Sequence, residues 1–474
     1  MSKKIAEVFY RDLWGLAKDK RRSLLDGDAG PYEAFAPTKA RRWKLVPYEA
    51  AGGYEDWPAL DELFPEQSMG INTNRGQDGS LIEMEKQVLA QRMQGYYSEE
   101  EWGTFASKHP VLATPRSRYQ PEKLRAQLRK ITSFQAERIL PYLNLPLDLR
   151  WIYYEDVGKL ISERSPKLWE NLPSNEFLVT VSEPRQKSES RPLLTHELFG
   201  LHLHDRGSTG FLATHRVIVG SGLFEEGVSE FANLAEPAWR ALRGPEEVTD
   251  ELSSAAAKNL VRTLFRIVLA LGHSPLFESD HGQSLGQDWL HLPIPKDRQL
   301  FGQLASAGDK VAILLDPSAD AREVLQELLG PWYPRLGVVS RAADAIGPPD
   351  YAVSYSYFGG GKGRWESRLA KAEDWPAAWG DQTGELYLNP TTYLANVPEK
   401  VWRYQLGGYP VIKKWLGYRD AKRRSGNPLT QDELAHLRSI VQRLAALHIL
   451  HSQLDSLYER IGSDVFTAEE LGLR

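Results

Sequence analysis

The sequence predicts a mixed α+β protein with an N-terminal coupling segment, a mixed β-rich region with helical insertions, and a C-terminal helical cap. Short runs of β-branched and aromatic residues, such as residues 150–154 and 176–182, are typical of strands. Apolar residues at spacings of three and four between Leu260 and Leu271 indicate a helix. A Thr-Gln-Asp-Glu capping box at Thr430 precedes a long leucine stripe, which predicts a helix near the C-terminus.

The first half of the chain is predicted to contain both element types. Glycines and prolines between residues 27 and 53 indicate a loop-rich connector after a first helix. Residues 194–204 are ambiguous, and the pattern from 224 to 275 is helical, with an acidic run at its start. The expected elements are helices at residues 5–25, 81–93 and 121–140 and strands at residues 150–154 and 176–182.

The second half is predicted to hold a second β region and then three helices. Strands are expected at residues 311–315, 336–340, 350–358 and 385–389, separated by turns rich in Gly and Pro. Pro398 and Pro410 can each start a helix, because the N–H that proline lacks would be unpaired at the first turn. Gly407 and Gly408 suit the left-handed position that ends the first of these helices.

Composition excludes several classes of protein. The 474 residues, 42% of them hydrophobic and with 14 Trp and 20 Tyr, supply cores for two or three domains folded against each other. No apolar run approaches the roughly 18–20 residues that span a bilayer, and no apolar segment follows the charged N-terminus. Zero Cys excludes disulfides and thiolate metal sites. We therefore expect a cytoplasmic protein without membrane contact.

Charge is segregated along the chain although the net charge is only −5. Residues 115–140 hold seven basic and two acidic side chains, and residues 398–428 hold eight basic and two acidic ones. Residues 223–251 have the opposite bias, with eight acidic and two basic side chains. Such asymmetry would orient the molecule towards a polyanion.

Motifs for catalysis are missing. The glycine-rich run at residues 359–364 lacks the hydroxyl of a phosphate-binding loop, so we expect no ATP site. Leu-Asn-Pro-Thr-Thr-Tyr at residues 388–393 is similar to the Asn-Pro-Pro-Tyr loop of amino-methyltransferases but lacks its second Pro. No glycine-rich turn for S-adenosylmethionine stands upstream. Only Asp420-Ala-Lys422 places a carboxylate two residues before a lysine, as a nuclease needs, and it lies in a basic loop.

The histidines give no clear metal site. Alternation would put His202 and His204 on one strand face near His196, where two metal ligands could sit. Gly200 occupies the position of the second His in a thermolysin-like motif. A solvated or backbone-bonded strand face is therefore the favoured interpretation, and we predict no catalytic or metal-binding residue.

Binding residues are predicted in two classes. Tyr351, Tyr355 and Tyr357 alternate with Val353, either as core packing or as contacts to bases or sugars beside the glycine loop. Tyr355, Tyr357 and Arg364 are the base-reading candidates. The second class would contact the phosphate backbone of DNA, and its members are Arg116, Arg118, Lys362, Lys413, Lys414, Arg419, Lys422, Arg423 and Arg424.

Residues 401–419, Val-Trp-Arg-Tyr-Gln-Leu-Gly-Gly-Tyr-Pro-Val-Ile-Lys-Lys-Trp-Leu-Gly-Tyr-Arg, carry a family resemblance. They are similar to the C-terminal specificity domain of type ISP restriction-modification enzymes and related adenine-specific DNA methyltransferases. Residues 146–154, Pro-Leu-Asp-Leu-Arg-Trp-Ile-Tyr-Tyr, resemble a second family motif, although Asn144-Leu145 stand where Tyr-Arg is usual. His273-Ser-Pro, residues 287–295, Tyr10 to Gly15 and Trp43 to Pro47 also resemble family positions.

The resemblance implies recognition of an asymmetric double-stranded DNA sequence for a neighbouring adenine methyltransferase, in a restriction or phage-defence system that also has a helicase and nuclease. The catalytic core is absent from this chain, so S-adenosylmethionine and ATP are expected only on partner domains or subunits. Two alternatives stay open: a divergent complete DNA methyltransferase or nuclease, and a non-catalytic scaffold of a phage-defence complex.

Five segments are predicted on this basis. Their boundaries are an N-terminal coupling segment at residues 1–70, a first α+β part of the specificity region at 71–223, a helical spacer at 224–300, a β-rich recognition part at 301–396 and a C-terminal helical cap at 397–474.

Overall fold

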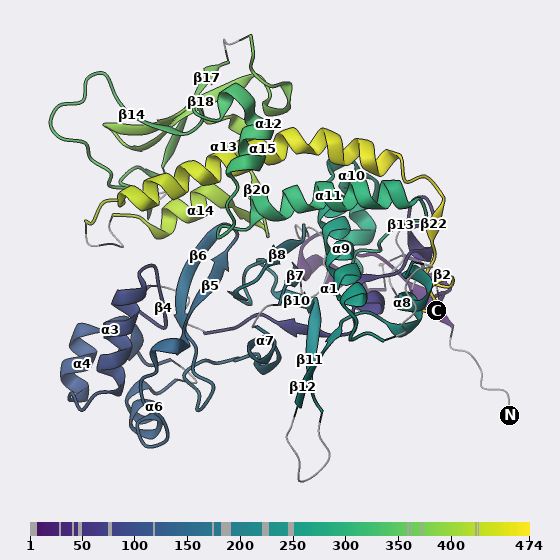
Figure 1. Cartoon of the computed structure of the whole chain (residues 1–474), viewed down its shortest axis with the longest axis horizontal. Helices are drawn as coiled ribbons and strands as arrows, with labels where there is room; N and C mark the ends of the chain where they lie inside the picture. Colours follow the sequence, from purple (N-terminus) through teal and green to yellow (C-terminus); the bar gives the residue numbers. More distant parts are fainter. Residues whose placement is uncertain are drawn as a thin grey trace.

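A computed structural model gives the fold of the chain. It describes residues 7–27, 30–39, 42–45, 50–73, 78–116, 119–172, 175–181, 191–219, 227–244, 251–357, 360–361, 363–370, 373–421, 424 and 426–474, apart from the side chains of residues 218–219, 356–357 and 360–361. The architecture is mixed α+β, as predicted, with several small sheets and a long C-terminal helix (Figure 1).

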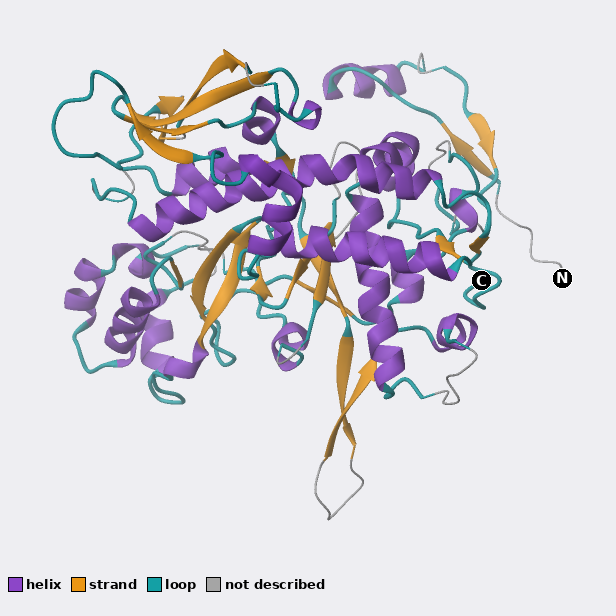
Figure 2. Cartoon of the chain, turned by 45° about the horizontal axis from the view of Figure 1, so that its top comes forward, coloured by secondary structure: helices purple, strands orange, loops and turns teal. Residues whose placement is uncertain are grey.

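The N-terminal unit is small and mostly exposed. Strand β1 (Val8–Tyr10) pairs antiparallel with β2 (Glu33–Phe35), and α1 (Ala17–Leu25), which lies between them in the sequence, buries no residue. Figure 2 shows this unit at the top right, away from the helical layer. The predicted helix at residues 5–25 is therefore wrong for its first part, where residues 8–10 form a strand.

Two four-stranded sheets form the centre. Their strand orders are β3-β10-β7-β8 and β4-β6-β5-β9, antiparallel except for the parallel pair β5–β9. The strands are β3 (Gln67–Met69), β4 (Ile82–Glu83), β5 (Ile139–Leu145), β6 (Asp148–Tyr153), β7 (Phe177–Val181), β8 (Leu193–Thr195), β9 (Leu198–Phe199) and β10 (Ser208–Leu212). The strands predicted at residues 150–154 and 176–182 are confirmed as β6 and β7.

Short helices surround these sheets, and several form a lobe at the lower left of Figure 1. They are η1 (Tyr54–Asp56), α2 (Leu60–Leu63), α3 (Lys86–Tyr97), α4 (Trp102–Lys108), α5 (Pro110–Ala113), α6 (Pro121–Leu128), η2 (Ala136–Arg138) and α7 (Pro166–Glu170). The helix predicted at residues 121–140 ends early, because the chain turns at residues 129–132 and then enters β5. The helix predicted at residues 81–93 is shifted towards the C-terminus as α3.

A two-stranded hairpin, β11 (Thr214–Val219) and β12 (Gly227–Ala232), projects from the body at the bottom of Figure 1. It occupies part of the segment that the acidic run predicted to be helical. That prediction is wrong for residues 227–232, whose backbone pairs with β11 across the whole strand.

A layer of helices packs against the central sheets. It contains α8 (Glu236–Leu242), α9 (Ala255–Gly272), α10 (Pro275–Leu285), α11 (Arg298–Leu315), α12 (Arg322–Leu329), η3 (Gly330–Trp332) and α15 (Gln431–Glu459), with β13 (Ile294–Pro295) paired to β22 (Val465–Phe466). Helices α9 and α11 cross closely at Gly308, where an added Cβ would lie 1.8 Å from the carbonyl oxygen of Arg266. The predicted strand at residues 311–315 is wrong, because these residues end α11.

A third sheet lies beside α15, with strand order β14-β19-β18-β17. Its strands are β14 (Val338–Arg341), β17 (Arg364–Leu369), β18 (Gln382–Asn389) and β19 (Thr392–Ala395), with η4 (Ala377–Trp379) between β17 and β18 in the sequence and the short pair β15 (Ser356–Tyr357) and β16 (Gly360–Gly361) before β17. The strands predicted at 336–340 and 385–389 are confirmed. The strand predicted at 350–358 is reduced to residues 356–357.

The C-terminal helices begin where they were predicted. Helix α13 (Glu399–Arg403) follows Pro398, α14 (Val411–Tyr418) follows Pro410, and the capping box at Thr430 starts α15. Gly407 and Gly408 do not end α13, whose last turn closes at Tyr404. They form the turn between β20 (Gln405–Leu406) and β21 (Tyr409–Pro410), both with positive φ.

One contiguous hydrophobic cluster of buried residues extends from Tyr54 to Leu471 and joins the central sheets, the helical layer and the third sheet. In the part of the chain that the structure describes, no single helix is long and apolar enough to cross a membrane; α9 and α10 would suffice only together, and they are bent by 95°.

Candidate nucleic-acid interface

A buried ion network joins the two segments that carry the strongest family resemblance. Asp148, at the start of β6, accepts hydrogen bonds from Arg150 at 2.9 Å from Nε and 2.7 Å from Nη2. Arg419, which follows α14, lies 3.0 Å from the other oxygen of Asp148. Arg419 also pairs with Glu433 of α15, and Arg150 pairs with Asp78 at 2.8 Å.

This network places opposite charges together in the interior. Asp148 and Arg150 are fully buried, and only 5% of the Arg419 side chain is exposed. Burial alone would raise the pKa of Asp148, but the charges of Arg150 and Arg419 hold it at about 2. The carboxylate therefore stays ionised and fixes the β5–β6 hairpin to α14 and α15.

Arg419 therefore does not lie where a phosphate contact was predicted. Its guanidinium is inside the protein, over the ring of Trp415 at 3.8 Å, and committed to two carboxylates. Arg424 is also held, because its Nη1 lies 2.8 Å from Glu433 and only 17% of its side chain is exposed. Residues 398–428 therefore present fewer positive charges at the surface than their eight basic side chains suggest.

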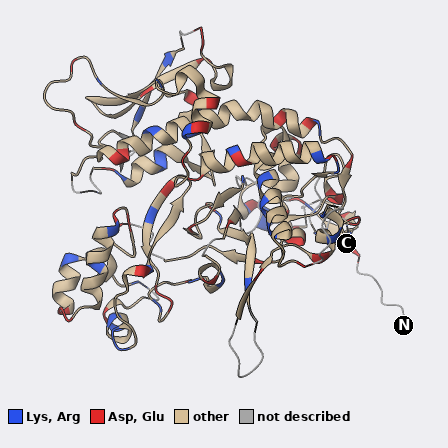
Figure 3. Ribbon diagram, viewed as in Figure 1, with Lys and Arg blue, Asp and Glu red and all other residues tan. Residues whose placement is uncertain are grey.

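Part of the first basic zone, residues 115–140, is also held by other groups of the protein. Arg125 is buried and donates to the carbonyl oxygens of Gly95, Tyr96 and Ser98. Arg138 pairs with acidic side chains, among them Asp156 at 2.5 Å. Figure 3 shows blue and red positions interspersed over most helices, without one continuous basic face in this view.

The other predicted phosphate contacts are partly exposed, exposed, or outside the described residues. Lys413 and Lys414 are partly exposed on α14, on the side opposite buried Val411 and Trp415. Their Nζ atoms lie 4.8 Å from the Trp402 ring centroid and 4.9 Å from the Tyr409 ring centroid. Arg116 is exposed in the loop before α6. Arg118, Lys362, Lys422 and Arg423 lie outside the described residues.

The predicted base-reading residues Arg364 and Tyr355 come together at an edge of the third sheet. Arg364, on edge strand β17, lies over the Tyr355 ring at 4.9 Å and pairs with Glu366, while 57% of its side chain is exposed. Tyr355 is not on a regular strand as predicted, and the side chain of Tyr357 is not among those described. Glu366 occupies one end of this guanidinium, so only its remaining N–H groups can meet a planar hydrogen-bonding partner.

Asn389 has a structural role rather than a base-gripping one. Its amide nitrogen donates to the carbonyl oxygens of Asp350 and Ala352, and its amide oxygen accepts from the backbone N–H of Thr391 and Thr392. The side chain is 1% exposed, and these bonds close the turn between β18 and β19. The likeness of this segment to a methyltransferase loop is therefore limited to sequence.

The histidines do not form the predicted strand face. His202 and His204 lie in the turn after β9, where His202 is exposed and His204 is fully buried. His204 Nε2 donates to the carbonyl of Arg191, and His196 Nδ1 lies 3.2 Å from the carbonyl of Asn175. Within the described ranges, no group of three or more His, Cys, Asp or Glu side chains could hold a metal ion.

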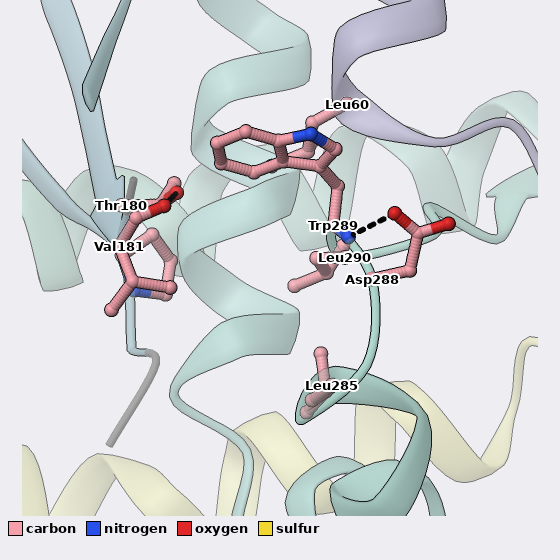
Figure 4. Close-up of a pocket in the computed structure, with 8 residues that line it drawn as sticks. Leu60, Thr180, Val181, Leu285, Asp288, Trp289 and Leu290 are labelled. Atoms are coloured by element: carbon pink, nitrogen blue, oxygen red, sulfur yellow. Dashed lines mark hydrogen bonds between the residues drawn. The ribbon is translucent and has the colours of Figure 1, made fainter. Parts of the chain in front are cut away.

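Two cavities differ in what they could hold. The one between β7 and the loop at residues 285–290 (Figure 4) has a volume of about 20 Å³, enough for a single water molecule. A polar pocket of about 330 Å³ lies between β5, the turn after β9 and α14. Sequence reasoning missed this pocket, and its only sequence signal is Asn144 in an otherwise apolar strand.

The family model of the type ISP C-terminal specificity domain matches residues 62–445. The chain belongs to this family. The resemblance seen in the sequence is thus confirmed, and the buried ion network is a feature of a type ISP specificity domain. No curated protein sequence matches the chain significantly.

Three solved structures share the fold of this specificity domain. The ATP-dependent type ISP restriction-modification enzyme LlaBIII bound to DNA is 16% identical with a TM-score of 0.57, over 92% of this chain and 26% of that one. A nuclease-deletion mutant of the type ISP enzyme LlaGI with a DNA substrate mimic is 15% identical with a TM-score of 0.54, over 95% and 33%. The DrdV–DNA complex is 17% identical with a TM-score of 0.57, over 97% and 44%. The chain therefore spans less than half the length of each of these proteins.

Proposed function

We propose that this specificity domain recognises a double-stranded DNA sequence and directs an adenine methyltransferase to it. The observation that carries the proposal is the family match over residues 62–445, supported by a fold shared with three DNA-bound enzymes. The exposed Arg364 on Tyr355 and the two lysines of α14 supply groups of the kinds that read bases and hold phosphates.

Replacing Lys413 and Lys414 together by Ala is expected to weaken binding to every duplex alike and to reduce the salt dependence. Removing one phosphate contact lowers the slope of log K against log salt by roughly 0.9. Fluorescence anisotropy on target and scrambled duplexes at two salt concentrations measures both effects. Lys296→Ala is the matched control, since that lysine pairs with Glu470 beside β13, on the other side of Figure 1 from α14. An unchanged slope in the double variant would remove these lysines from the interface.

Arg364→Ala is expected to weaken binding to the target duplex by roughly 5- to 150-fold and to leave scrambled DNA almost unaffected, because a bidentate arginine-to-guanine contact supplies discrimination of that size. The same anisotropy titrations decide the assignment. If Arg364→Ala weakens all duplexes equally while the lysine variant abolishes sequence preference, the two classes of residue are the wrong way round.

The two alternatives give different results in these experiments. A scaffold would bind target and scrambled duplexes with equal affinity, so no variant could change a preference. A complete but divergent methyltransferase would bind S-adenosylmethionine as the isolated chain, which calorimetric titration detects. We propose instead that S-adenosylmethionine and ATP bind only to partner domains or subunits.

The N-terminal unit exposes apolar side chains that a partner polypeptide could cover. Large apolar side chains are exposed there, including Trp14 at 84%, Leu25 at 87% and Trp43 at 64%. Exposed apolar side chains of this kind are available to pack against a partner. We infer that this unit docks the adenine methyltransferase, with a helicase and a nuclease in the whole enzyme. Arg42 fixes this unit to the body through Asp61 at 2.5 Å and Asp288 at 3.0 Å.

Trp14→Ser combined with Leu25→Ser is expected to lower the affinity for the methyltransferase polypeptide at least about tenfold. The cause is the smaller apolar area buried in the complex, at roughly 25 cal/mol per Å². Sedimentation velocity on mixtures of the two polypeptides measures the change. Leu369→Ser, which alters an exposed leucine on β17, is the control and should have no effect. Full association by the double variant would contradict this docking surface.

A further inference from the structure

The polar pocket beside α14 is built from segments distant in the sequence. Its volume is about 330 Å³, and it is lined by Ile71, Asn72 and Thr73 after β3, by Leu145 at the end of β5, and by Gly200. The polar and aromatic side chains that carry the argument are Tyr142, Asn144, His202, Tyr409, Lys414 and Tyr418. None of them is a member of the buried ion network described above.

Two polar side chains in the wall are buried and unpartnered. Tyr142 is 4% exposed and Asn144 is 9% exposed. Within the described part of the chain, neither the Tyr142 hydroxyl nor the Asn144 amide has a hydrogen-bond partner. Neither group is among the side-chain polar atoms sealed from solvent, so both face the open space of the pocket. A ligand there can take the hydrogen bonds that water otherwise supplies.

The backbone places both groups at the pocket. The β5–β6 register shifts between Leu143 and Leu145, so Asn144 stands at a bulge, a feature that redirects a side chain. Gly200 leaves room for the phenol, because an added Cβ there would lie 2.5 Å from the Tyr142 hydroxyl. The local structure thus keeps two unsatisfied groups facing one space.

The chemistry of the lining fits a nucleotide. Tyr409 and Tyr418 bring aromatic rings to the pocket. Lys414 Nζ lies 4.9 Å from the Tyr409 centroid and the Arg150 guanidinium 4.5 Å from the Tyr418 centroid, so a base can stack only on the opposite face of each ring. An Asn amide can pair with donor and acceptor positions on a base edge, and the ammonium of Lys414 can contact a phosphate. Because Tyr142 and Asn144 are more than nine-tenths buried, a base still stacked in a duplex cannot reach them.

We propose that this pocket binds one unstacked nucleotide of the DNA, with its base against Tyr142 and Asn144 and its phosphate near Lys414. The proposal rests on the proposed function, since DNA must be bound for its nucleotide to enter. A free mononucleotide has the same base and phosphate groups. The experiment therefore distinguishes a nucleotide within DNA from a free one.

The test compares matched duplexes that differ by a single unpaired nucleotide. In a bulged duplex the unpaired base is already out of the paired stack, so the full chain should bind it at least about tenfold more tightly than the paired duplex. All four bases are tried in the bulge, and Kd is measured by fluorescence anisotropy. Asn144→Ala and Tyr142→Phe should each reduce the best preference to less than about threefold.

Matched measurements keep the result interpretable. Tyr153→Phe removes a hydroxyl from neighbouring strand β6 and should leave the preference intact. Asn144→Ala and Tyr142→Phe should keep or raise the melting temperature, because neither of the removed groups has a partner. A large fall in melting temperature together with an unchanged preference would show a structural role and overturn the proposal.

The remaining outcomes separate this inference from the proposed function. If the chain selects its target duplex but shows no bulge preference, the pocket assignment is wrong and DNA recognition stands. If the chain binds no DNA, the proposed function is wrong. Titration with dAMP, dGMP, dCMP and dTMP then decides the pocket, and mononucleotide binding without DNA binding would overturn the assignment to DNA.

Discussion

Asp148→Asn is expected to lower the free energy of unfolding by about 3–5 kcal/mol, because breaking a buried ion pair on one side costs about this much. The substitution leaves the buried guanidiniums of Arg150 and Arg419 without their shared carboxylate. It also loosens the attachment of the β5–β6 hairpin to α14. Urea unfolding followed by tryptophan fluorescence measures the change.

The chain offers a closely matched control for this substitution. Asp320 pairs with Arg322 at 2.6 Å with the same two-residue spacing, but both side chains are mostly exposed. Asp320→Asn should therefore change the free energy of unfolding far less than Asp148→Asn, because water and salt screen an exposed ion pair. Equal effects of the two substitutions would show that burial does not govern the strength of the Asp148 network.

The C-terminal elements could be predicted because their signals are local. The capping box at Thr430 forms as expected, with Thr430 Oγ1 accepting from the Glu433 N–H and Glu433 accepting from the Thr430 N–H. Pro398 and Pro410 each precede a helix. In contrast, residues 311–315 contain β-branched residues typical of strands, yet they end a helix that starts at the Asp297 cap and packs along α9.

The candidate site was only partly predictable, because charge counts do not show where a side chain points. Lys413 and Lys414, two of the predicted phosphate contacts, are partly exposed on α14. Arg419 was placed on the surface although its partners, Asp148 and Glu433, come from other elements and hold it inside. No local pattern reports such pairing between segments distant in the sequence.

The pocket was missed for the same reason. The alternation of β5 does not reveal the bulge at Asn144, nor that Gly200 of a distant turn leaves space for Tyr142. The family could be recognised from residues 401–419 because a sequence motif depends only on which amino acids stand at fixed spacings. The geometry that makes the residues useful depends on contacts across the fold.

Acidification is expected to unfold the chain cooperatively between about pH 6 and pH 4. Burial lowers the pKa of His204 and His281 to about 4 and of His273 to about 3, from an ordinary value of 6.5. These rings are neutral in the folded protein, whereas the unfolded chain binds protons below about pH 6.5. Their contribution to stability is therefore complete above that pH and is lost as the pH falls towards the folded pKa values, by about 1.4 kcal/mol per pH unit for each group.

His273→Gln tests this origin of the pH dependence. The glutamine amide can still donate to the Pro192 carbonyl that His273 Nε2 contacts at 2.8 Å, but it binds no proton in the unfolded chain. The three histidines together supply part of the slope of unfolding free energy against pH between about pH 6 and pH 4.5. His273→Gln should lower that part of the slope by about one third. If His273→Gln keeps the full slope, the acid sensitivity in this pH range does not come from the His273 imidazole.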